Sequence, residues 1–137
     1  MYKDRVTVFN CKRGAVKDTW YPTTLTGNLN MDKGAMVKAY GADTQDRCVL
    51  NVRLEGDRIG GKKFLPPKEW QALEDPSDYI TFNTGTTPDF FMAGEWPEGV
   101  VTEDGFYERM LKEKDYVFAV TSVGYFSVIP HLEVTGK

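Results

Sequence analysis

Residues 115–134, DYVFAVTSVGYFSVIPHLEV, contain two apolar runs separated by a short break. Both runs are rich in Val, Ile, Phe and Tyr, which fit the pleated, half-buried surface of a β-sheet. Gly124 lies in the break and accepts the positive φ that a tight turn requires. The stretch therefore predicts an antiparallel hairpin in which residues 116–122 pair with residues 125–134.

The first strand of this hairpin is largely apolar on both faces. One face carries Tyr116, Phe118 and Val120, and the other carries Val117, Ala119 and Thr121. Such a strand belongs inside a barrel or between packed layers. In the second strand Pro130 cannot donate a ladder hydrogen bond, so we expect that strand to be an edge strand or to be bulged there.

Alternation of apolar residues predicts further strands along the chain. It is clearest over residues 46–54, where Cys48, Leu50, Val52 and Leu54 share one face. Shorter runs of the same kind predict strands at residues 5–9, 16–25, 63–65, 79–82 and 89–94.

Two short helices interrupt the β pattern. Pro67 suits the first position of a helix over residues 67–73. A second, amphipathic helix is expected over residues 106–114, after a loop that begins at residue 95, and Asp104 is expected to cap it. Its apolar residues at helical spacing are Tyr107, Met110 and Leu111.

The length and the spacing of turns define the fold class. A chain of 137 residues favours one domain, residues 1–137, with a core that needs no disulfides. Turn signals recur about every eight to twelve residues. We predict a mainly β fold, a small antiparallel β-barrel or sandwich of roughly seven to eight short strands with one or two short helices.

Residues 27–45 are rich in Gly, Asn and Asp, and they form either a short strand or a flexible arm. A loop of this length is unusual unless it is functional or disordered, so one alternative is that it orders only on contact with a partner. Protease sensitivity of this arm in isolated protein, with protection in an assembly, would support that alternative. The predicted partner-interface residues are Met31, Met36, Tyr40 and Trp96.

The net charge and the cysteines indicate which partners and which cellular compartment to expect. The 17 basic and 20 acidic side chains give a net charge of −3, which supplies no global attraction to nucleic acid. Cys11 and Cys48 are far apart in the chain and are expected to be structural thiols in a reducing compartment. No signal peptide and no apolar run of about 20 residues is present, which predicts folding in the cytoplasm and no membrane span.

Two features of the sequence resemble parts of functional sites, a phosphate-binding loop and a metal site, but neither is complete. GDRIGGKK, residues 56–63, matches part of a phosphate-binding loop, but Lys63 replaces the Ser or Thr that would reach Mg²⁺. Residues 66–67 are both proline and block the helix that should follow, so a hairpin turn is expected instead. His131 is the only histidine, which excludes a multi-histidine metal site. No catalytic, metal or cofactor site is predicted.

The remaining candidates for functional residues are acidic and aromatic side chains. The loop after residue 94 is a solvated surface, a contact for a basic partner, or an acid–base pair if buried. Its carboxylates are Glu95, Glu98, Glu103 and Asp104. Trp20 and Tyr21 are expected in the core, whereas Trp96 is either a core plug or an exposed interface anchor.

Short motifs run along most of the chain. They are VTVFN (6–10), WYPT (20–23), GK (61–62), PP (66–67), LEDP (73–76), DYVF (115–118), TSV (121–123) and PHLEV (130–134). Together they resemble a family of small virion-associated proteins of tailed phages and prophages of Gram-positive bacteria. The closing hairpin is similar to that of head–tail joining, or head-closure, proteins, although those compact proteins lack the insertion at residues 95–114.

This resemblance implies a head–tail connector or neck subunit, a structural protein and not an enzyme. It would be a small β-barrel without a cofactor that is a monomer alone and joins a ring on assembly. Its partners would be portal, adaptor and tail components, with no membrane and no specific nucleic acid. It would occupy the bacterial host cytoplasm and then the virion neck. The alternative function is a β-barrel that binds a small ligand or single-stranded nucleic acid through Trp20, Tyr21 or Trp96.

Overall fold

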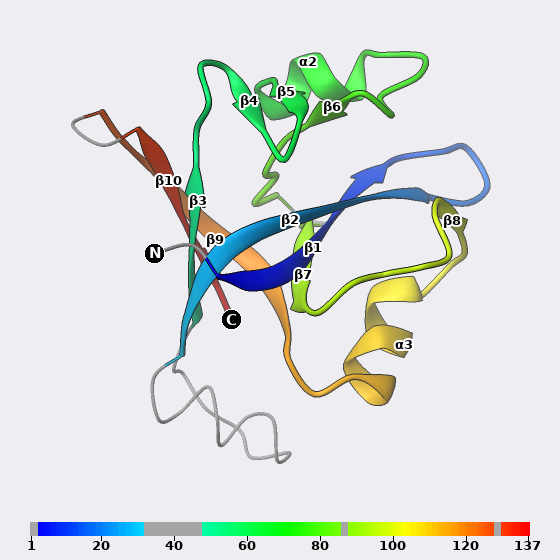
Figure 1. Cartoon of the computed structure of the whole chain (residues 1–137). Helices are drawn as coiled ribbons and strands as arrows, with labels where there is room; N and C mark the ends of the chain where they lie inside the picture. Colours follow the sequence, from blue (N-terminus) through cyan, green and yellow to red (C-terminus); the bar gives the residue numbers. More distant parts are fainter. Residues whose placement is uncertain (1–2, 32–47, 86–87, 128–129) are drawn as a thin grey trace.

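A computed structural model describes residues 3–31, 48–85, 88–127 and 130–137 (Figure 1). The fold is a closed antiparallel six-stranded barrel with one extra strand, which confirms the predicted small β-barrel. The barrel strands are β1 (Asp4–Lys12), β2 (Thr19–Met31), β3 (Cys48–Arg53), β7 (Phe90–Ala93), β9 (Val117–Phe126) and β10 (His131–Gly136).

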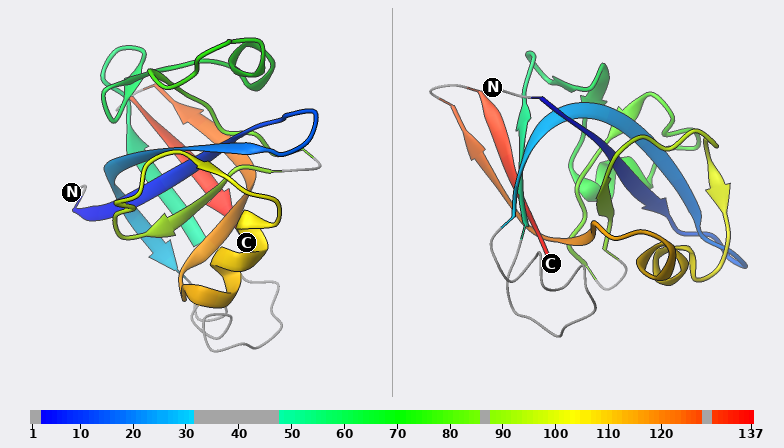
Figure 2. Two further views of the ribbon diagram at one scale, coloured as in Figure 1. Left: turned by 90° about the vertical axis from the view of Figure 1, so that its right-hand side faces the viewer. Right: turned by 60° about the horizontal axis from the view of Figure 1, so that its bottom comes forward.

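The order around the barrel is β1-β7-β9-β10-β3-β2, and β2 closes the ring by pairing with β1. This closing pair is long, with Asp4 opposite Gly27 at one end and Lys12 opposite Thr19 at the other. The C-terminal part of β2 pairs with β3, and its N-terminal part pairs with the extra strand β8 (Val101–Thr102). β2 therefore bends from one side of the barrel to the other (Figure 2).

A second, three-stranded sheet gathers with a helix at one end of the barrel, at the top of Figure 1. It consists of β4 (Arg58–Ile59), β5 (Lys62–Phe64) and β6 (Tyr79–Ile80), with α2 (Pro67–Gln71) between β5 and β6. β4 and β5 form the expected hairpin over residues 56–63. Ile59, Ile80 and Phe82 join the barrel's apolar cluster, so this unit closes that end of the core.

Buried side chains form two clusters. The barrel cluster fills the interior, and its buried members from the barrel strands are Val6, Val8, Leu25, Cys48, Leu50, Val52, Phe91, Phe118, Val120, Leu132 and Val134. The outer cluster lies between β1, β2, β7 and α3 (Phe106–Glu113), and its buried members are Phe9, Cys11, Trp20, Phe90, Met92, Phe106, Met110 and Val117. The alternation of β1, with Val6 and Val8 on one face and Phe9 on the other, supplies both clusters.

Helix α3 packs on the outer cluster through two of its three predicted apolar residues, Met110 and Tyr107. Phe106 joins them, whereas Leu111 is exposed, so that part of the prediction is wrong. Gly105, with φ 71°, is the N-cap residue, and the helix start has no side-chain cap hydrogen bond. The prediction that Asp104 caps this helix is therefore wrong, because the left-handed conformation that begins the helix falls on the glycine after it.

The closing hairpin turns later than expected. Gly124 lies inside β9 opposite Glu133, and β10 begins only at His131, after Pro130. The predicted turn at Gly124 is wrong, because continued pairing provides ladder partners that a turn there would forfeit. β10 is a central strand between β9 and β3, so the predicted edge at Pro130 is also wrong. Proline is tolerated because it precedes the first paired residue.

Replacing Gly136 with alanine is expected to lower the free energy of unfolding by about 2–3 kcal/mol. A Cβ atom at this position would lie 2.7 Å from Phe91 Cε1 and 2.8 Å from Phe118 Cβ, inside the packed barrel. Urea denaturation followed by tryptophan fluorescence measures the change. Gly85→Ala is the control, since its nearest contact is an ordinary 3.4 Å from Asn83. Equal stability of the two variants would contradict the packing described here.

Candidate interaction surface

β9 leaves the barrel wall halfway along its length. Its first residues pair with β7, and the last contact with that side is the hydrogen bond from Val120 N to Asp89 O at 2.9 Å. The register then shifts, with Val120 opposite Gly136 but Ser122 opposite Thr135, so Thr121 is the extra residue of a bulge. Beyond it, β10 is the only strand that pairs with β9 in the described part of the chain.

Residues 121–126 therefore form an open strand edge, called here the open edge. In Figures 1 and 2 this end of the β9–β10 hairpin projects away from the barrel.

Two hydrogen-bonded contacts show which backbone groups point outward. Leu54 N donates to Pro130 O at 3.0 Å, so Pro130 faces β3, and Lys137 exchanges hydrogen bonds with Ala119, so Lys137 faces β9. Because backbone groups alternate along an antiparallel strand, the odd-numbered residues of β10 face β9. Their partners on β9 are Ser122, Gly124 and Phe126.

Consequently, the N–H and C=O groups of Val123 and Tyr125 point away from β10, toward the open edge. The side chains of the same two residues are exposed, Val123 by 37% and Tyr125 by 62%. They lie opposite Val134 and Leu132, which are buried in the barrel cluster, so they extend the inner apolar face beyond the core.

The open edge lacks two of the usual protections of a soluble sheet edge, charged side chains and proline. Strand edges are commonly guarded by Lys, other charges or Pro, which prevent pairing with another chain. Residues 121–127, TSVGYFS, contain no charged residue and no proline. Outward backbone groups beside two exposed apolar side chains form a surface suited to accept another strand.

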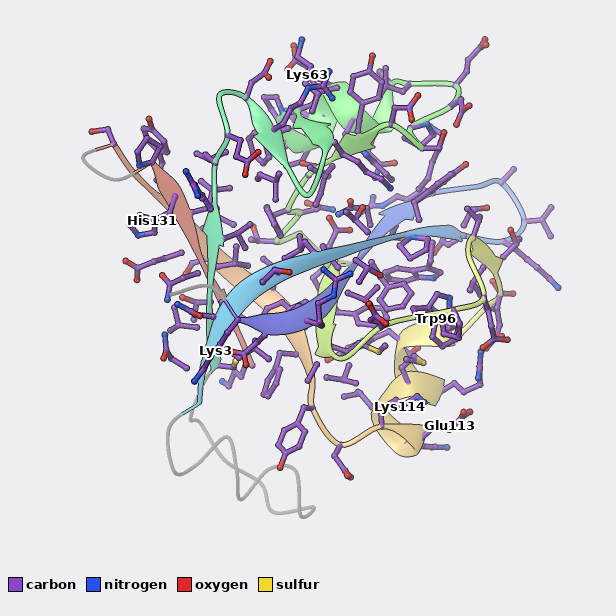
Figure 3. All side chains as sticks on the ribbon, viewed as in Figure 1. Lys3, Lys63, Trp96, Glu113, Lys114 and His131 are labelled. Carbon is purple, nitrogen blue, oxygen red and sulfur yellow. The ribbon has the colours of Figure 1, made fainter. Side chains whose placement is uncertain are left out.

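Of the four residues predicted for the interface, Met31 and Trp96 lie within the described part of the chain. Met31 ends β2 opposite Cys48, and Met36 and Tyr40 lie outside the described residues. Trp96 is half-buried against the outer cluster (Figure 3), with its ring 5.5 Å from Phe9 and 5.6 Å from Phe106. Its Nε1 donates to Gly99 O at 2.9 Å. These contacts are those of a core plug.

Replacing Trp96 with alanine is expected to cost about 1–3 kcal/mol of unfolding free energy, because two edge-on ring contacts would be lost. Thermal unfolding monitored by circular dichroism provides the measurement. Val100→Ala, in the same loop at an exposed residue, should leave the stability unchanged. If the two variants unfold together, the Trp96 ring does not contribute to the core.

The other candidate aromatics are also engaged within the molecule. Trp20 is buried with its ring 5.1 Å from Phe90, as expected for a core residue. Tyr21 meets Trp70 edge-on at 5.9 Å. These internal contacts provide no support for a role of either ring in stacking against a base or a sugar.

The acidic loop forms ion pairs with arginines of the chain itself. Glu95 lies 3.0 Å from Arg5, and Glu103 lies 2.7 Å from Arg109. A cavity of about 360 Å³ beside α3 is lined by Glu103, Asp18 and Glu108 together with aromatic groups. Its carboxylates would repel a phosphate backbone, which does not favour the nucleic-acid alternative.

Asp89 is a buried carboxylate that sequence reasoning missed. It accepts hydrogen bonds from Cys11 N, Asn10 Nδ2 and Asn83 N, each at 2.9 Å. Burial raises the pKa of Asp89 to about 7, although these hydrogen bonds act in the opposite direction. Asn10 Nδ2 also donates to Thr81 O at 2.6 Å. The cluster joins β1, β7 and the segment after β6.

This raised pKa predicts a pH-dependent stability. The folded-state pKa lies above the unfolded value of 3.8, so folding favours the protonated acid. The stabilisation is complete below the unfolded pKa and is lost as pH rises through about 7. Relative to Asp89→Asn, the native protein should lose about 2–3 kcal/mol of unfolding free energy between pH 5 and pH 8. Parallel pH profiles from urea denaturation would contradict this.

The cysteines behave as structural residues. Cys11 and Cys48 are both buried and are thiols, not a disulfide, as expected. Burial, reinforced by Asp18 and Asp89, raises the pKa of Cys11 to about 12, so its sulfur stays protonated. A group of three or more His, Cys, Asp or Glu side chains able to hold a metal is not found among the described residues.

Comparisons with protein-family models, curated proteins and solved structures found no match to this chain. Within the described ranges, neither helix has the length and apolar character needed to cross a membrane.

Proposed function

We propose that this protein is a structural subunit of a phage or prophage neck, a head–tail connector that acts through surface contacts and not through catalysis. The observation that carries this proposal is the open edge of β9. It combines outward backbone groups with the exposed side chains of Val123 and Tyr125 and lacks charge. A surface of this kind is suited to joining protein chains.

Two further observations support the proposal. The barrel interior is filled by buried side chains, so the barrel is a rigid support for its surface. The motifs DYVF, TSV and PHLEV, which carry much of the resemblance to head-closure proteins, all fall in or beside β9 and β10. The resemblance and the open edge therefore concern the same part of the molecule.

Complementation of a prophage that lacks this gene tests the proposal. Variants are supplied in trans, and heads, tails and joined particles are counted by electron microscopy. Native protein should restore joined particles, whereas Val123→Lys combined with Tyr125→Lys should leave heads and tails separate. Val16→Lys, at a residue that is 86% exposed elsewhere, is the matched control and should restore joining. Normal particles in the absence of the protein would refute the proposal.

A further inference from the structure

We infer that the open edge pairs two copies of this chain, antiparallel, about a two-fold axis at Gly124. The inference deepens the proposed function, on which its biological meaning rests, because it names a partner for the same surface. Its physical basis is the geometry of the edge alone. A test on isolated protein can therefore succeed or fail independently of the complementation experiment.

The backbone geometry selects the register. The outward N–H and C=O groups belong to Val123 and Tyr125, and they form hydrogen bonds only if they face outward groups of the second copy. Placing Gly124 opposite the partner's Gly124 sets Val123 opposite the partner's Tyr125. In an antiparallel ladder such opposed residues exchange two hydrogen bonds. The two-fold axis repeats this exchange on the other side of the glycines.

The side chains agree with this register. Val123 and Tyr125 extend from the same face of β9, so each valine would lie against the partner's tyrosine across the axis. Pairs of aromatic and β-branched side chains in this position stabilise a sheet. On the opposite face Gly124 meets the partner's Gly124, and glycine itself has no side chain that could clash.

Charge also permits self-association. About a two-fold axis, any charged side chain near Gly124 would lie close to the same charge of the second copy, which is unfavourable. Residues 121–127 carry no charge, so this penalty is absent. The neutral edge thus removes the usual obstacle to pairing between identical strands.

The expected association is weak. An edge of six residues, whose described exposed apolar side chains are those of Val123 and Tyr125, buries less than the roughly 1,600 Å² of a standard interface. We expect monomers in dilute solution and pairing at high local concentration, as in an assembly. A two-fold contact closes on itself, so it joins subunits in pairs, and contacts around a ring would need a different surface.

Disulfide trapping tests the register directly. Gly124→Cys would place two thiols at a non-hydrogen-bonded pair, where Cα atoms are about 4.5 Å apart, within the range of a disulfide. Oxidised by glutathione at high protein concentration, Gly124→Cys should form dimers on a non-reducing gel at least about tenfold faster than Val16→Cys, the exposed control. Adding Val123→Lys to Gly124→Cys should abolish this advantage. The native cysteines are buried and are present in every variant.

Equal trapping rates for Gly124→Cys and Val16→Cys would overturn the inference. If Gly124→Cys does not fold, sedimentation equilibrium of the native sequence decides. Its mean mass should rise with concentration, Val123→Lys should prevent the rise, and a monomer at every concentration would overturn the inference.

Failed trapping together with impaired joining by the lysine variants would assign the edge to another virion protein. Successful trapping together with normal particles in the absence of the protein would refute the proposed function and retain the pairing.

Discussion

Replacing Asp89 with alanine is expected to lower the free energy of unfolding by about 3–5 kcal/mol, because several buried donors would lose their acceptor together. This carboxylate accepts hydrogen bonds from Cys11 N, Asn10 Nδ2 and Asn83 N, and Asp89 is fully buried. Asn10 would keep its bond to Thr81 O, but the two backbone donors would be left unpaired.

Urea denaturation at pH 7 measures this effect. Asp104→Ala, at an exposed aspartate, is the control and should change stability very little. A loss of less than about 1 kcal/mol in Asp89→Ala would mean that water replaces the missing acceptor. The carboxylate would then not be the element that holds β1, β7 and the segment after β6 together.

Replacing Trp70 with alanine is expected to cost about 3–5 kcal/mol. Its side chain is fully buried and is among the largest in the core, and its Nε1 donates to Tyr79 O at 3.2 Å. Helix α2 spans only five residues, too short to persist without tertiary packing. Loss of the indole should therefore release α2 and the β4–β5–β6 sheet from the end of the barrel.

Hydrogen exchange separates this local release from global unfolding. In Trp70→Ala, the amides of β5 and β6 should exchange faster than those of β1 and β3. Glu69→Ala, on the same helix at an exposed residue, should exchange like the native protein. A uniform change over the whole chain would contradict an independent role for Trp70 in attaching this sheet.

Strand positions could be predicted wherever burial alternates along one strand. The pattern at residues 46–54 anticipated β3, because Cys48, Leu50 and Val52 are buried in the barrel while Val49, Asn51 and Arg53 are not fully buried. The hairpin turn could not be placed in the same way. Glycine is typical of turns, but whether Gly124 turns depends on how far β9 and β10 continue to pair, and here Gly124 pairs with Glu133.

The open edge was harder to anticipate for a related reason. The open edge exists because β7 pairs with β9 only as far as Ala119, and that limit is a property of barrel closure. The available signal was an uncharged strand, TSVGYFS, without proline or lysine. Asp89 was missed because it follows a Gly-Thr-Thr-Pro stretch typical of a solvated turn, and only the folded chain brings it to Asn10 and Cys11.

Quantitative mass spectrometry of gradient-purified phage-like particles, induced from the organism that encodes this chain, tests the central claim most directly. Isotope-labelled peptides of this chain and of the major capsid protein would give its copy number per particle. A structural neck subunit should be present at a fixed, low copy number relative to the capsid protein. Recovery of the protein only from the soluble lysate, and not from particles, would contradict the account.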